Sequence, residues 1–465
     1  MSLKLYNSLT RKKESLKPVK GRQVSLYTCG LTVYDYAHVG NLRTYLFEDV
    51  LKRVLIYNGY KVEHVENITD VGHLVSDADE GEDKMLKALK REGLKPTKKG
   101  LMKLAEKYTK AFIADKEDLN ILPPKKYTKA TEHVNLMVEM IKKIEANGFT
   151  YETSDGLYFD TLKLENYGQL AQLELDPKKF QARVASSAEK RNPQDFALWL
   201  KAVGPNAKHV LQWSSPWGKG FPGWHIECSA MSSKYLGKPF DIHCGGIDHL
   251  PVHHTNERAQ NIAAFGKPIV KTWCHGDFLL FKDKKMAKSA GEFMKLGDLV
   301  KKDVDPLAYR YLHLQTHYRQ KLSFSWESLQ GAANALAKLK STIAEWKVGN
   351  KVSASYEKDF SSAVNDDLNL PKALAVVWDL IADKKISEEV KKKTILKFDE
   401  VLGLDLKKSK KIIVPSEVKE LISDREKARA EKDWAKADTL RKKITKLGFE
   451  LDDTPQGTVV KKISS

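Results

Sequence analysis

The sequence contains little cysteine and no long apolar segment. Its four cysteines, at positions 29, 228, 244 and 274, are too few and too scattered for a disulfide framework. No apolar run of about 18 residues is present, so no segment is predicted to cross a membrane as a helix. The first residues also lack the apolar core of a secretion signal. We therefore expect a cytoplasmic protein with reduced thiols and no membrane contact.

Acidic residues are in deficit. Lys and Arg number 79 against 61 Asp and Glu, which gives a net charge of +18. The excess is spread in lysine doublets and triplets, and it indicates either a polyanionic partner such as nucleic acid or a lysine-rich solvated surface. At 465 residues, of which 42% are hydrophobic, the chain is long enough for roughly three packed domains.

The first part of the chain has the pattern of a doubly wound α/β sheet. Val24–Tyr27 is predicted to form a short buried strand. Apolar residues recur at helical spacing over Leu42–Tyr57, and Asn58-Gly59 ends that helix. A second extended run, Tyr60–Ile68, follows. This βαβ order predicts a Rossmann-like parallel sheet.

The pattern of predicted helices and strands changes further along the chain. A helix near Glu132–Ala146 and several short extended segments predict an inserted α/β module between about 115 and 220. The sheet is expected to resume with Phe240–His243 and with Thr272–Leu280. From Asp303 onward the pattern is helical nearly throughout, and a final helix is predicted from about Glu417 to Leu447, closed by Gly448.

A first candidate site is the string His38-Val39-Gly40-Asn41, between the first strand and the first helix. Glycine there lets a ligand approach the backbone, and the free N–H groups of a helix N-terminus bind phosphate. An imidazole can donate a hydrogen bond to phosphate oxygens as they gain charge. Taken alone, however, the string also fits an ordinary strand-to-helix turn of any α/β protein.

A second candidate is Lys285-Met286-Ala287-Lys288-Ser289, which follows the last expected strand. Two lysines and a hydroxyl in a loop suit a mobile clamp on a triphosphate. In isolation a solvated basic loop is the simpler interpretation. The histidine string and the lysine string together resemble the paired nucleotide-binding signatures of class I aminoacyl-tRNA synthetases.

A third candidate is a metal site. His253 and Glu257 are four residues apart, so on a helix they share one face and can bind one metal ion. Two thiolates from distant cysteines would complete a tetrahedral set. The spacing does not decide which two of the four cysteines take part, and two buried thiols beside an unrelated His-His pair remain the alternative.

Several blocks of sequence resemble cysteinyl-tRNA synthetases. The resemblance extends over nearly the whole chain, in the order of the family. Its blocks are Tyr27–Asn41 (YTCGLTVYDYAHVGN), Asn67–Val71 (NITDV), Phe221–Met231 (FPGWHIECSAM), Asp241–Glu257 (DIHCGGIDHLPVHHTNE), Phe324–Glu327 (FSWE) and Asp452–Thr458 (DDTPQGT).

This resemblance implies a function and a site. The enzymes of this family activate L-cysteine with ATP to cysteinyl-adenylate, release pyrophosphate, and transfer cysteine to the 3′-terminal adenosine of tRNA(Cys). The resemblance implies one Zn²⁺ per chain, held by Cys29, Cys228, His253 and Glu257, and Mg²⁺ bound with ATP. By motif, ATP binding falls to His38, Gly40, Asn41, Lys285, Lys288 and Ser289, of which His38, Asn41, Lys285 and Lys288 are catalytic. The cysteine pocket is expected to consist of Thr69, Trp224, His243 and Asp248.

The motifs depart from the family pattern at a few positions. Ala287 replaces the first serine of the lysine motif, and Thr255 replaces a usual glutamate beside the metal. Cys244 stands where the family usually has glycine, and Cys274 lies outside the ligand motifs. We expect both of these cysteines to be small buried residues. None of the departures removes a group that the expected chemistry requires.

The C-terminal third is expected to bind tRNA. Basic and aromatic side chains on a helical frame suit single-stranded RNA, because phosphates meet Lys and Arg while splayed bases stack. The candidates are Arg425, Arg429, Trp434 and Arg441. A solvated helical face is the alternative from composition alone, whereas the resemblance implies an anticodon-binding region here.

We expect a monomer with the following division. The catalytic domain comprises 1–115 and 221–300, an inserted module 116–220, a stem-contact junction 301–330, a helical anticodon-binding bundle 331–400 and a C-terminal RNA-binding module 401–465. Two rival functions are a metabolic ligase of the same catalytic fold that activates cysteine, and a non-catalytic RNA-binding paralogue.

Overall fold

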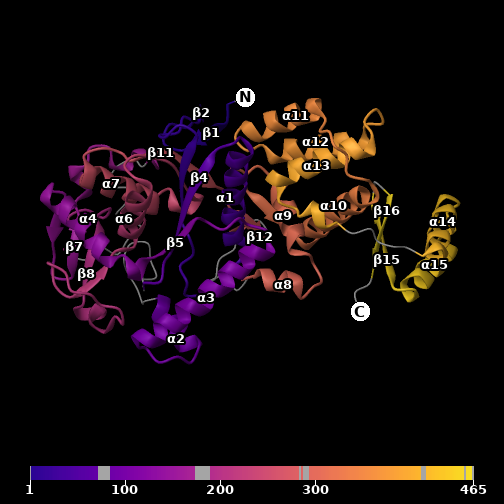
Figure 1. Cartoon of the computed structure of the whole chain (residues 1–465). Helices are drawn as coiled ribbons and strands as arrows, with labels where there is room; N and C mark the ends of the chain where they lie inside the picture. Colours follow the sequence, from indigo (N-terminus) through magenta and orange to yellow (C-terminus); the bar gives the residue numbers. More distant parts are fainter. Residues whose placement is uncertain are drawn as a thin grey trace.

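The computed structural model describes residues 2–71, 84–172, 189–281, 284–285, 293–409, 415–454 and 457–462. The elongated molecule has an α/β body, and a small C-terminal unit lies at the end opposite the inserted module (Figure 1). Among the described residues, no helix combines the length and the apolar character that a membrane crossing requires.

The centre is a five-stranded parallel sheet, as the βαβ pattern predicted. Its order is β11-β10-β3-β4-β5. The strands are β3 (Gln23–Thr28), β4 (Lys61–Ile68), β5 (Lys126–Lys129), β10 (Phe240–Gly246) and β11 (Val270–Gly276). The chain winds from β3 toward β5 on one side and returns through β10 to β11 on the other. The order therefore reverses between β3 and β10, which is where open parallel sheets bind their ligands.

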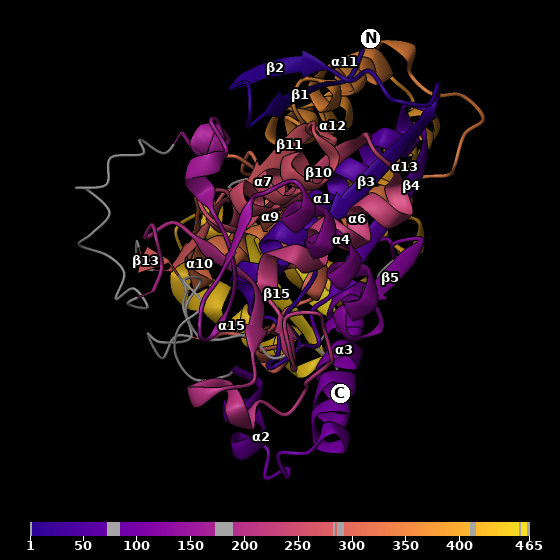
Figure 2. The ribbon, with the colours of Figure 1, turned by 90° about the vertical axis from the view of Figure 1, so that its left-hand side faces the viewer.

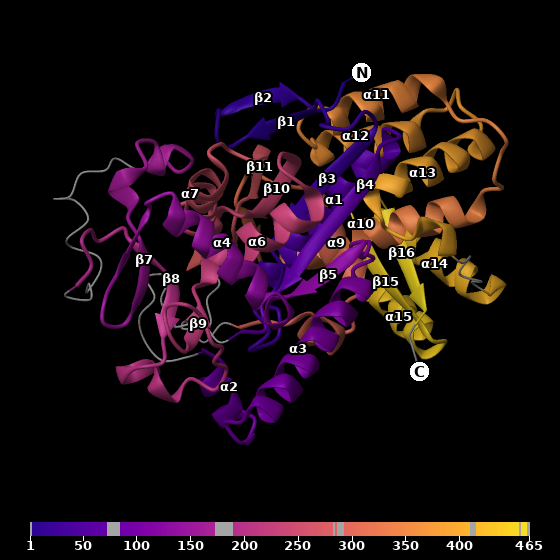
Figure 3. The ribbon, with the colours of Figure 1, turned by 60° about the vertical axis from the view of Figure 1, so that its left-hand side comes forward.

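Helices cover both faces of this sheet (Figure 3). The helices around the sheet are α1 (Val39–Tyr57), α3 (Lys98–Asp118), α6 (Trp224–Leu236) and α7 (His253–Phe265), whereas α2 (Lys84–Arg91) packs on α3 away from the sheet. Most of α1 is buried, including Leu42, Leu46 and Val50, and this explains why its sequence has apolar residues on several faces.

The inserted module has its own four-stranded antiparallel sheet, of order β6-β7-β8-β9. It consists of α4 (Val134–Ala146), β6 (Thr150–Glu152), β7 (Gly156–Phe159), β8 (Phe196–Lys201) and β9 (Gly220–Pro222). Strand β5 lies within residues 116–220, yet it pairs with β4 in the central sheet. Its four residues carry too short a pattern to be assigned to a sheet from sequence.

Short elements connect the sheet to the helical part. They are the N-terminal hairpin β1 (Lys4–Asn7) and β2 (Lys12–Ser15), then β12 (Leu279–Phe281), β13 (Lys284–Lys285), α8 (Leu296–Val300), α9 (Pro306–Leu314) and β14 (Leu322–Phe324). Strand β12 pairs in parallel with β14, so the segment after β11 is held by the segment after α9.

The helical bundle comprises α10 (Trp326–Glu345), α11 (Ala354–Asn365), α12 (Leu370–Ala382) and α13 (Glu388–Leu402). Its apolar residues belong to the same core as those of α1. A buried ionic contact reinforces this junction: Arg310 of α9 bonds Asp49 of α1 at 2.6 Å and the carbonyl of Leu402 at 2.6 Å. The bundle is thus continuous with the α/β body.

The final helix predicted over Glu417–Leu447 is wrong. This segment instead forms two helices, α14 (Ser416–Ala430) and α15 (Trp434–Lys446). The hairpin of β15 (Phe449–Thr454) and β16 (Gly457–Lys462) follows them. Lys432 has φ 61°, and the side chain of Asp433 caps the new helix by accepting from the Lys436 N–H. The break contains neither glycine nor proline, so no helix-breaking residue in the sequence marks the turn.

Candidate functional site

Three elements bring the predicted metal ligands together. Cys29 follows the carboxyl end of β3, Cys228 lies on α6, and His253 and Glu257 lie one turn apart on α7. All four side chains are buried, with exposed fractions from 0 to 4%. One donor atom from each lies within 4.8 Å of the others, so the group could hold one metal ion. Of the four cysteines, Cys29 and Cys228 are therefore the ones beside His253 and Glu257.

The donor spacing fits zinc. The sulfurs of Cys29 and Cys228 are 3.8 Å apart, and His253 Nε2 lies 3.1 Å from Glu257 Oε1. A tetrahedral ion with Zn–S bonds of about 2.3 Å separates two sulfur ligands by about 3.8 Å. Sulfur, imidazole and carboxylate together are also a donor set that zinc prefers.

Backbone packing explains how Cys29 reaches this position. Gly30 lies so close to β4 that a Cβ atom there would stand 1.7 Å from the Asn67 carbonyl oxygen. Its N–H donates to the Asn67 side chain at 2.9 Å. Only glycine permits this close approach, which directs Cys29 toward α6 and α7.

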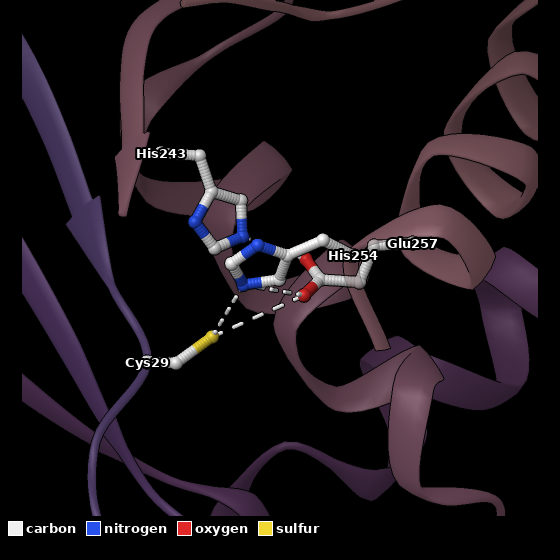
Figure 4. A group of neighbouring side chains, drawn as sticks. All are labelled: Cys29, His243, His254 and Glu257. Carbon is white, nitrogen blue, oxygen red and sulfur yellow. Dashed lines mark hydrogen bonds and ion pairs between the residues drawn. The ribbon is translucent and has the colours of Figure 1, made fainter. Parts of the chain in front are cut away.

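A second group of donors overlaps the first. Cys29, His243, His254 and Glu257 also lie within 4.8 Å of one another (Figure 4). His254 Nε2 is 3.3 Å from the Cys29 sulfur, and His243 Nε2 is 2.8 Å from Glu257 Oε2. Because this group contains one thiol and shares two residues with the first, we interpret the two histidines as outer partners that orient Cys29 and Glu257.

Further histidines extend the network outward. The ring of His254 contacts His275 (Nδ1 to Nε2, 2.8 Å), and His275 contacts the Ser8 hydroxyl at 2.7 Å. On the other side, His253 Nδ1 lies 3.0 Å from His225 Nδ1. Burial and the neighbouring histidines hold the pKa values of His254 and His275 well below 6.5, so both rings are neutral. Neutral rings each carry one N–H and one acceptor, as a directional chain requires.

The electrostatics of the site favour a cation. Burial raises the pKa of Glu257, but His243 and His253 outweigh it and bring that pKa to about 2. Burial likewise opposes ionisation of Cys228, yet hydrogen bonds with Cys29 and His253 hold its pKa at about 7. Against burial, Glu257 and Cys228 raise the pKa of His253 to about 10. Burial and the neighbouring Cys228 raise the pKa of Cys29 well above its usual value, so Glu257 and Cys228 are the donors that carry negative charge, and they attract a cation to the site.

The histidine string forms the N-terminal cap of α1. His38 Nδ1 accepts from the Asn41 N–H at 3.0 Å, and the Asn41 side chain accepts from the His38 N–H at 3.3 Å. Since Nδ1 is the acceptor, a neutral ring would carry its proton on Nε2. The capping pair explains why histidine and asparagine stand three residues apart.

This cap opens onto a cavity of about 210 Å³. His38, Gly40, Asn41 and Asp248 line it, together with Gly276 and Asp277, which we call the cavity floor. The cavity therefore lies at the start of α1 and at the carboxyl ends of β10 and β11, and Gly245, next to its lining residue Gly246, packs against His254. A nucleotide phosphate bound there would face the free N–H groups at the start of α1.

Two regions of the chain match known protein families. Residues 15–334 match the family described as tRNA synthetases class I (C) catalytic domain, and residues 414–458 match the cysteinyl-tRNA ligase anticodon binding domain. The cysteine–tRNA ligase 1 of Burkholderia lata is 49% identical, over 98% of this chain and 96% of the relative. The cysteine–tRNA ligase of Treponema denticola is 44% identical over the full length of both chains.

The chain belongs to the cysteine–tRNA ligase family. Its fold is shared more widely. The methionyl-tRNA synthetase of Mycobacterium tuberculosis, solved in complex with methionyl-adenylate, is similar with a TM-score of 0.54 and 15% identity, over 83% of this chain and 90% of that one. The predicted Rossmann-like class I synthetase fold is confirmed.

The residues expected in the cysteine pocket surround the same region in this member of the family. The Trp224 ring lies 4.4 Å from that of His253, centre to centre. The Thr69 hydroxyl is buried and donates to Glu227 at 2.9 Å. Asp248 lines the 210 Å³ cavity, whereas His243 contacts Glu257. Trp224 and His243 therefore contact members of the metal-ligand group, Thr69 contacts the residue that precedes Cys228, and Asp248 lines the cavity.

Part of the lysine motif lies outside the described residues. The backbone of Lys285 belongs to β13, which pairs with β12 beside the cavity. Lys288 and Ser289 fall outside the described ranges, so their ATP contacts stay predictions.

The structure separates the four candidate tRNA residues into two kinds. Arg425 is buried, with a 2% exposed side chain, and holds Asp453 through two bonds of 2.8 and 2.5 Å. Arg441 donates to the Leu451 carbonyl at 2.9 Å. Trp434 is 58% exposed and lies against Arg429. Trp434 and Arg441 are thus the exposed members, whereas Arg429 is partly exposed and bonds Asp453 at 2.7 Å, and buried Arg425 orients the hairpin.

Sequence reasoning missed several site residues. His225, His254 and His275 touch the predicted ligands or each other, and Glu227 receives the Thr69 hydroxyl. Only two local signals were available: His254 adjoins His253, and His225 adjoins Trp224. His275 adjoins none of the predicted ligands in the sequence and lies 21 residues after His254. The parallel pairing of β11 with β10 brings it near that residue.

Proposed function

We propose that this chain binds ATP and L-cysteine side by side in the site described, and joins cysteine to tRNA(Cys). The cysteine carboxylate attacks the α-phosphorus of ATP, the bond to the β-phosphate oxygen breaks, and pyrophosphate leaves as cysteinyl-adenylate forms. A ribose hydroxyl of the 3′-terminal adenosine then attacks the adenylate carbonyl, and AMP leaves. The observation that carries this proposal is that the buried Cys/Cys/His/Glu group and the cavity at the start of α1 both lie at the carboxyl ends of the parallel strands.

We propose Zn²⁺ as the ion held by Cys29, Cys228, His253 and Glu257. When bound, zinc would supply a soft Lewis acid that favours the substrate thiol over a serine hydroxyl. Size alone separates such near-isosteres by only about 1–3 kcal/mol. His254 contacts the Cys29 thiol at 3.3 Å, and the Trp224 ring lies 4.4 Å from that of the proposed ligand His253, so both residues would help to hold this donor set in place.

The remaining residues act on the phosphates and the substrate. The Nε2–H of His38 is directed away from its helix cap and can donate to a phosphate oxygen. Gly40 and Asn41 present the backbone N–H groups of α1 to the same anion. Lys285 and Lys288 would neutralise charge as pyrophosphate departs, with Mg²⁺ bound to the phosphates. Asp248 is positioned for the α-amino group of cysteine, because its carboxylate lines the same cavity.

We propose that the helical region reads the tRNA away from the catalytic body. Exposed Trp434 beside Arg429 offers a stacking surface with a cation, which suits an unpaired base and its phosphate. The expected division into domains stays a proposal, with β5 assigned to the catalytic sheet. A monomeric, cytoplasmic enzyme is likewise proposed, and light scattering of the purified chain tests the monomer.

Two rivals are less well supported. A metabolic ligase that activates cysteine would not need an anticodon-binding region, which this chain matches over residues 414–458. A non-catalytic paralogue would have no reason to keep a complete donor group.

The proposed function is tested by cysteine-dependent exchange of pyrophosphate into ATP. We expect exchange with cysteine, negligible exchange with serine, and loss of activity after a zinc chelator that added zinc reverses. Exchange of equal rate with serine would contradict the zinc-based selection of substrate.

Lys288→Ala should slow pyrophosphate exchange far more than it weakens cysteine binding. The lost charge acts on the reacting phosphates, and a contact of this kind typically contributes about 10²–10³ in rate. The matched control is Lys301→Ala, an 80% exposed lysine paired with Asp298, which should leave the rate unchanged. Normal exchange by the Lys288→Ala chain would mean that the loop is only a solvated basic turn.

A further inference from the structure

The corner Asp366-Asp367-Leu368-Asn369, between α11 and α12, is unusually constrained. Asp367 and Leu368 have φ 57° and 55°, in the left-handed region that non-glycine residues rarely adopt. Two such residues in succession are unfavourable on their own, so tertiary contacts must hold them. The corner is far along the chain from every proposed catalytic residue, and the proposed function assigns it no role.

Asp367 is the centre of a dense set of hydrogen bonds. Its side chain is completely buried. Oδ1 accepts from the Tyr318 hydroxyl at 2.7 Å and from the Tyr6 N–H at 2.8 Å, and Oδ2 accepts from Arg319 Nε at 2.8 Å. The Asp367 carbonyl also lies 2.8 Å from His317 Nε2. One carboxylate thus joins the bundle to β1 and to the turn at 317–320.

The N-terminal hairpin lies beside α11, where this corner begins (Figure 2). The Asp367 N–H donates to the Lys4 carbonyl at 3.0 Å, so backbone and side chain both bind the edge of the hairpin. A buried carboxylate with three donors is stable only as a complete set, because each donor left alone would be a buried unpaired group.

The 317–320 turn contacts residues that line the phosphate cavity. The Tyr318 carbonyl accepts from the N–H of Asp277, which lines the cavity floor, at 2.8 Å. The Tyr318 ring stacks on Phe47 of α1, with centres 4.4 Å apart and planes 3° from parallel. Phe47 in turn lies 3.1 Å from the space that a Cβ on Gly276 would occupy, and Gly276 also lines the cavity.

A second connection runs through Arg43 of α1. Arg43 Nε donates to the Asp277 carbonyl at 2.8 Å, and its Nη2 donates to the Gln320 carbonyl. Both carbonyls therefore depend on one buried guanidinium, which ties the turn to the cavity floor. Only one residue, Tyr318, lies between the Asp367 carboxylate and the backbone of Asp277.

We propose that Asp367 is a positioning residue for ATP. It holds the 317–320 turn, and that turn fixes the positions of Asp277 and Gly276 in the floor of the phosphate cavity. This inference rests on the proposed function for the identity of the nucleotide. Misplacing a binding surface by about 1 Å can cost a site up to about 10²-fold, so the effect on ATP should be measurable.

The test compares two adjacent carboxylates in the full chain. Asp367→Asn keeps the size of the side chain but removes the charge that accepts from Arg319. Asp366→Asn is the matched control, because the Asp366 side chain is half exposed and forms a surface ion pair with Lys13 at 2.7 Å. Binding of a non-hydrolysable ATP analogue is measured by calorimetry, together with KM for ATP and for cysteine in pyrophosphate exchange.

We expect Asp367→Asn to raise the Kd of the analogue and the KM for ATP by about tenfold, with the KM for cysteine unchanged. Asp366→Asn should change none of the three. A purely structural role would lower the active fraction, and thus kcat, without changing either KM. An unchanged Kd for the analogue in Asp367→Asn would overturn the proposal.

A milder variant covers the case in which Asp367→Asn does not fold. Tyr318→Phe keeps the stack on Phe47 and removes one hydrogen bond to Asp367, so a smaller rise, about threefold in Kd, is expected. Parental affinity in Tyr318→Phe would also overturn the proposal. Because the analogue binds without cysteine, this measurement is independent of the exchange assay. Failure of cysteine-dependent exchange in the parental chain would count against the proposed function alone.

Discussion

Cys228→Ser should lose its bound zinc and nearly all cysteine activation. The hydroxyl of serine is a poor ligand for zinc and is not ionised at neutral pH, so three donors remain where four stood. Metal-assisted binding of this kind is worth several kcal/mol, and we expect pyrophosphate exchange to fall by at least ~10³-fold. Elemental analysis of the purified chain measures the zinc directly.

The chain offers a matched control for this experiment. Cys274→Ser changes a cysteine that is equally buried, on β11, but that lies outside both donor groups among the described residues. Its sulfur lies 3.7 Å from the Tyr6 carbonyl, and a serine hydroxyl can make the same contact. Zinc content and exchange should be retained. An undiminished zinc content in the Cys228→Ser chain would contradict the assignment of Cys228 as a zinc ligand.

A chain that ends at Ser409 should activate cysteine but charge tRNA poorly. The truncation removes α14, α15 and the β15–β16 hairpin, which have a small core of their own made by Val418, Ile444, Phe449 and Leu451. The metal ligands and the phosphate cavity lie upstream. We expect exchange to stay within about twofold, while kcat/KM for tRNA charging falls by about 10²-fold or more as phosphate and base contacts are lost.

The truncation point follows from the structure. The bundle α10–α13 shares its core with α1, and Arg310 joins the two through buried contacts, so a cut within α10 would expose apolar surface of the catalytic body. Ending at Ser409 avoids this damage, and exchange activity serves as the internal control for folding.

Salt dependence gives a second measurement on the same pair of chains. Contacts between basic side chains and phosphates release counterions, so log K for tRNA should fall linearly with log salt concentration. The slope should be shallower for the truncated chain. Equal tRNA charging and equal slopes in both chains would show that the region after Ser409 does not bind tRNA.

Some features of the fold could be predicted from local patterns. The helix over Leu42–Tyr57 and the strands around it have apolar periodicities that sequence reasoning recognises, and the structure confirms them within a few residues. The break between α14 and α15 could not be predicted in the same way. No glycine or proline marks it in the sequence, and only the positive φ of Lys432 and the capping by Asp433 show the turn.

The candidate site was predictable where its geometry is local. His253 and Glu257 share one helix face, and His38 caps the helix three residues from Asn41, because helix geometry alone sets both relations. Spacing could not choose the two cysteine ligands among four. Family resemblance indicated Cys29 and Cys228, and the structure places these two at the donor group while Cys244 and Cys274 pair side by side within the sheet.

The sequence by itself determined the family, the order of the elements and the chemical types of the ligands, because these reside in short motifs and in periodicity. Only the tertiary structure decided which residues surround those motifs. His275 reaches His254 through parallel strand pairing, and Asp367 reaches the floor of the phosphate cavity through Tyr318. Such contacts join segments separated by up to hundreds of residues, and they depend on how the whole core packs, which no local pattern records.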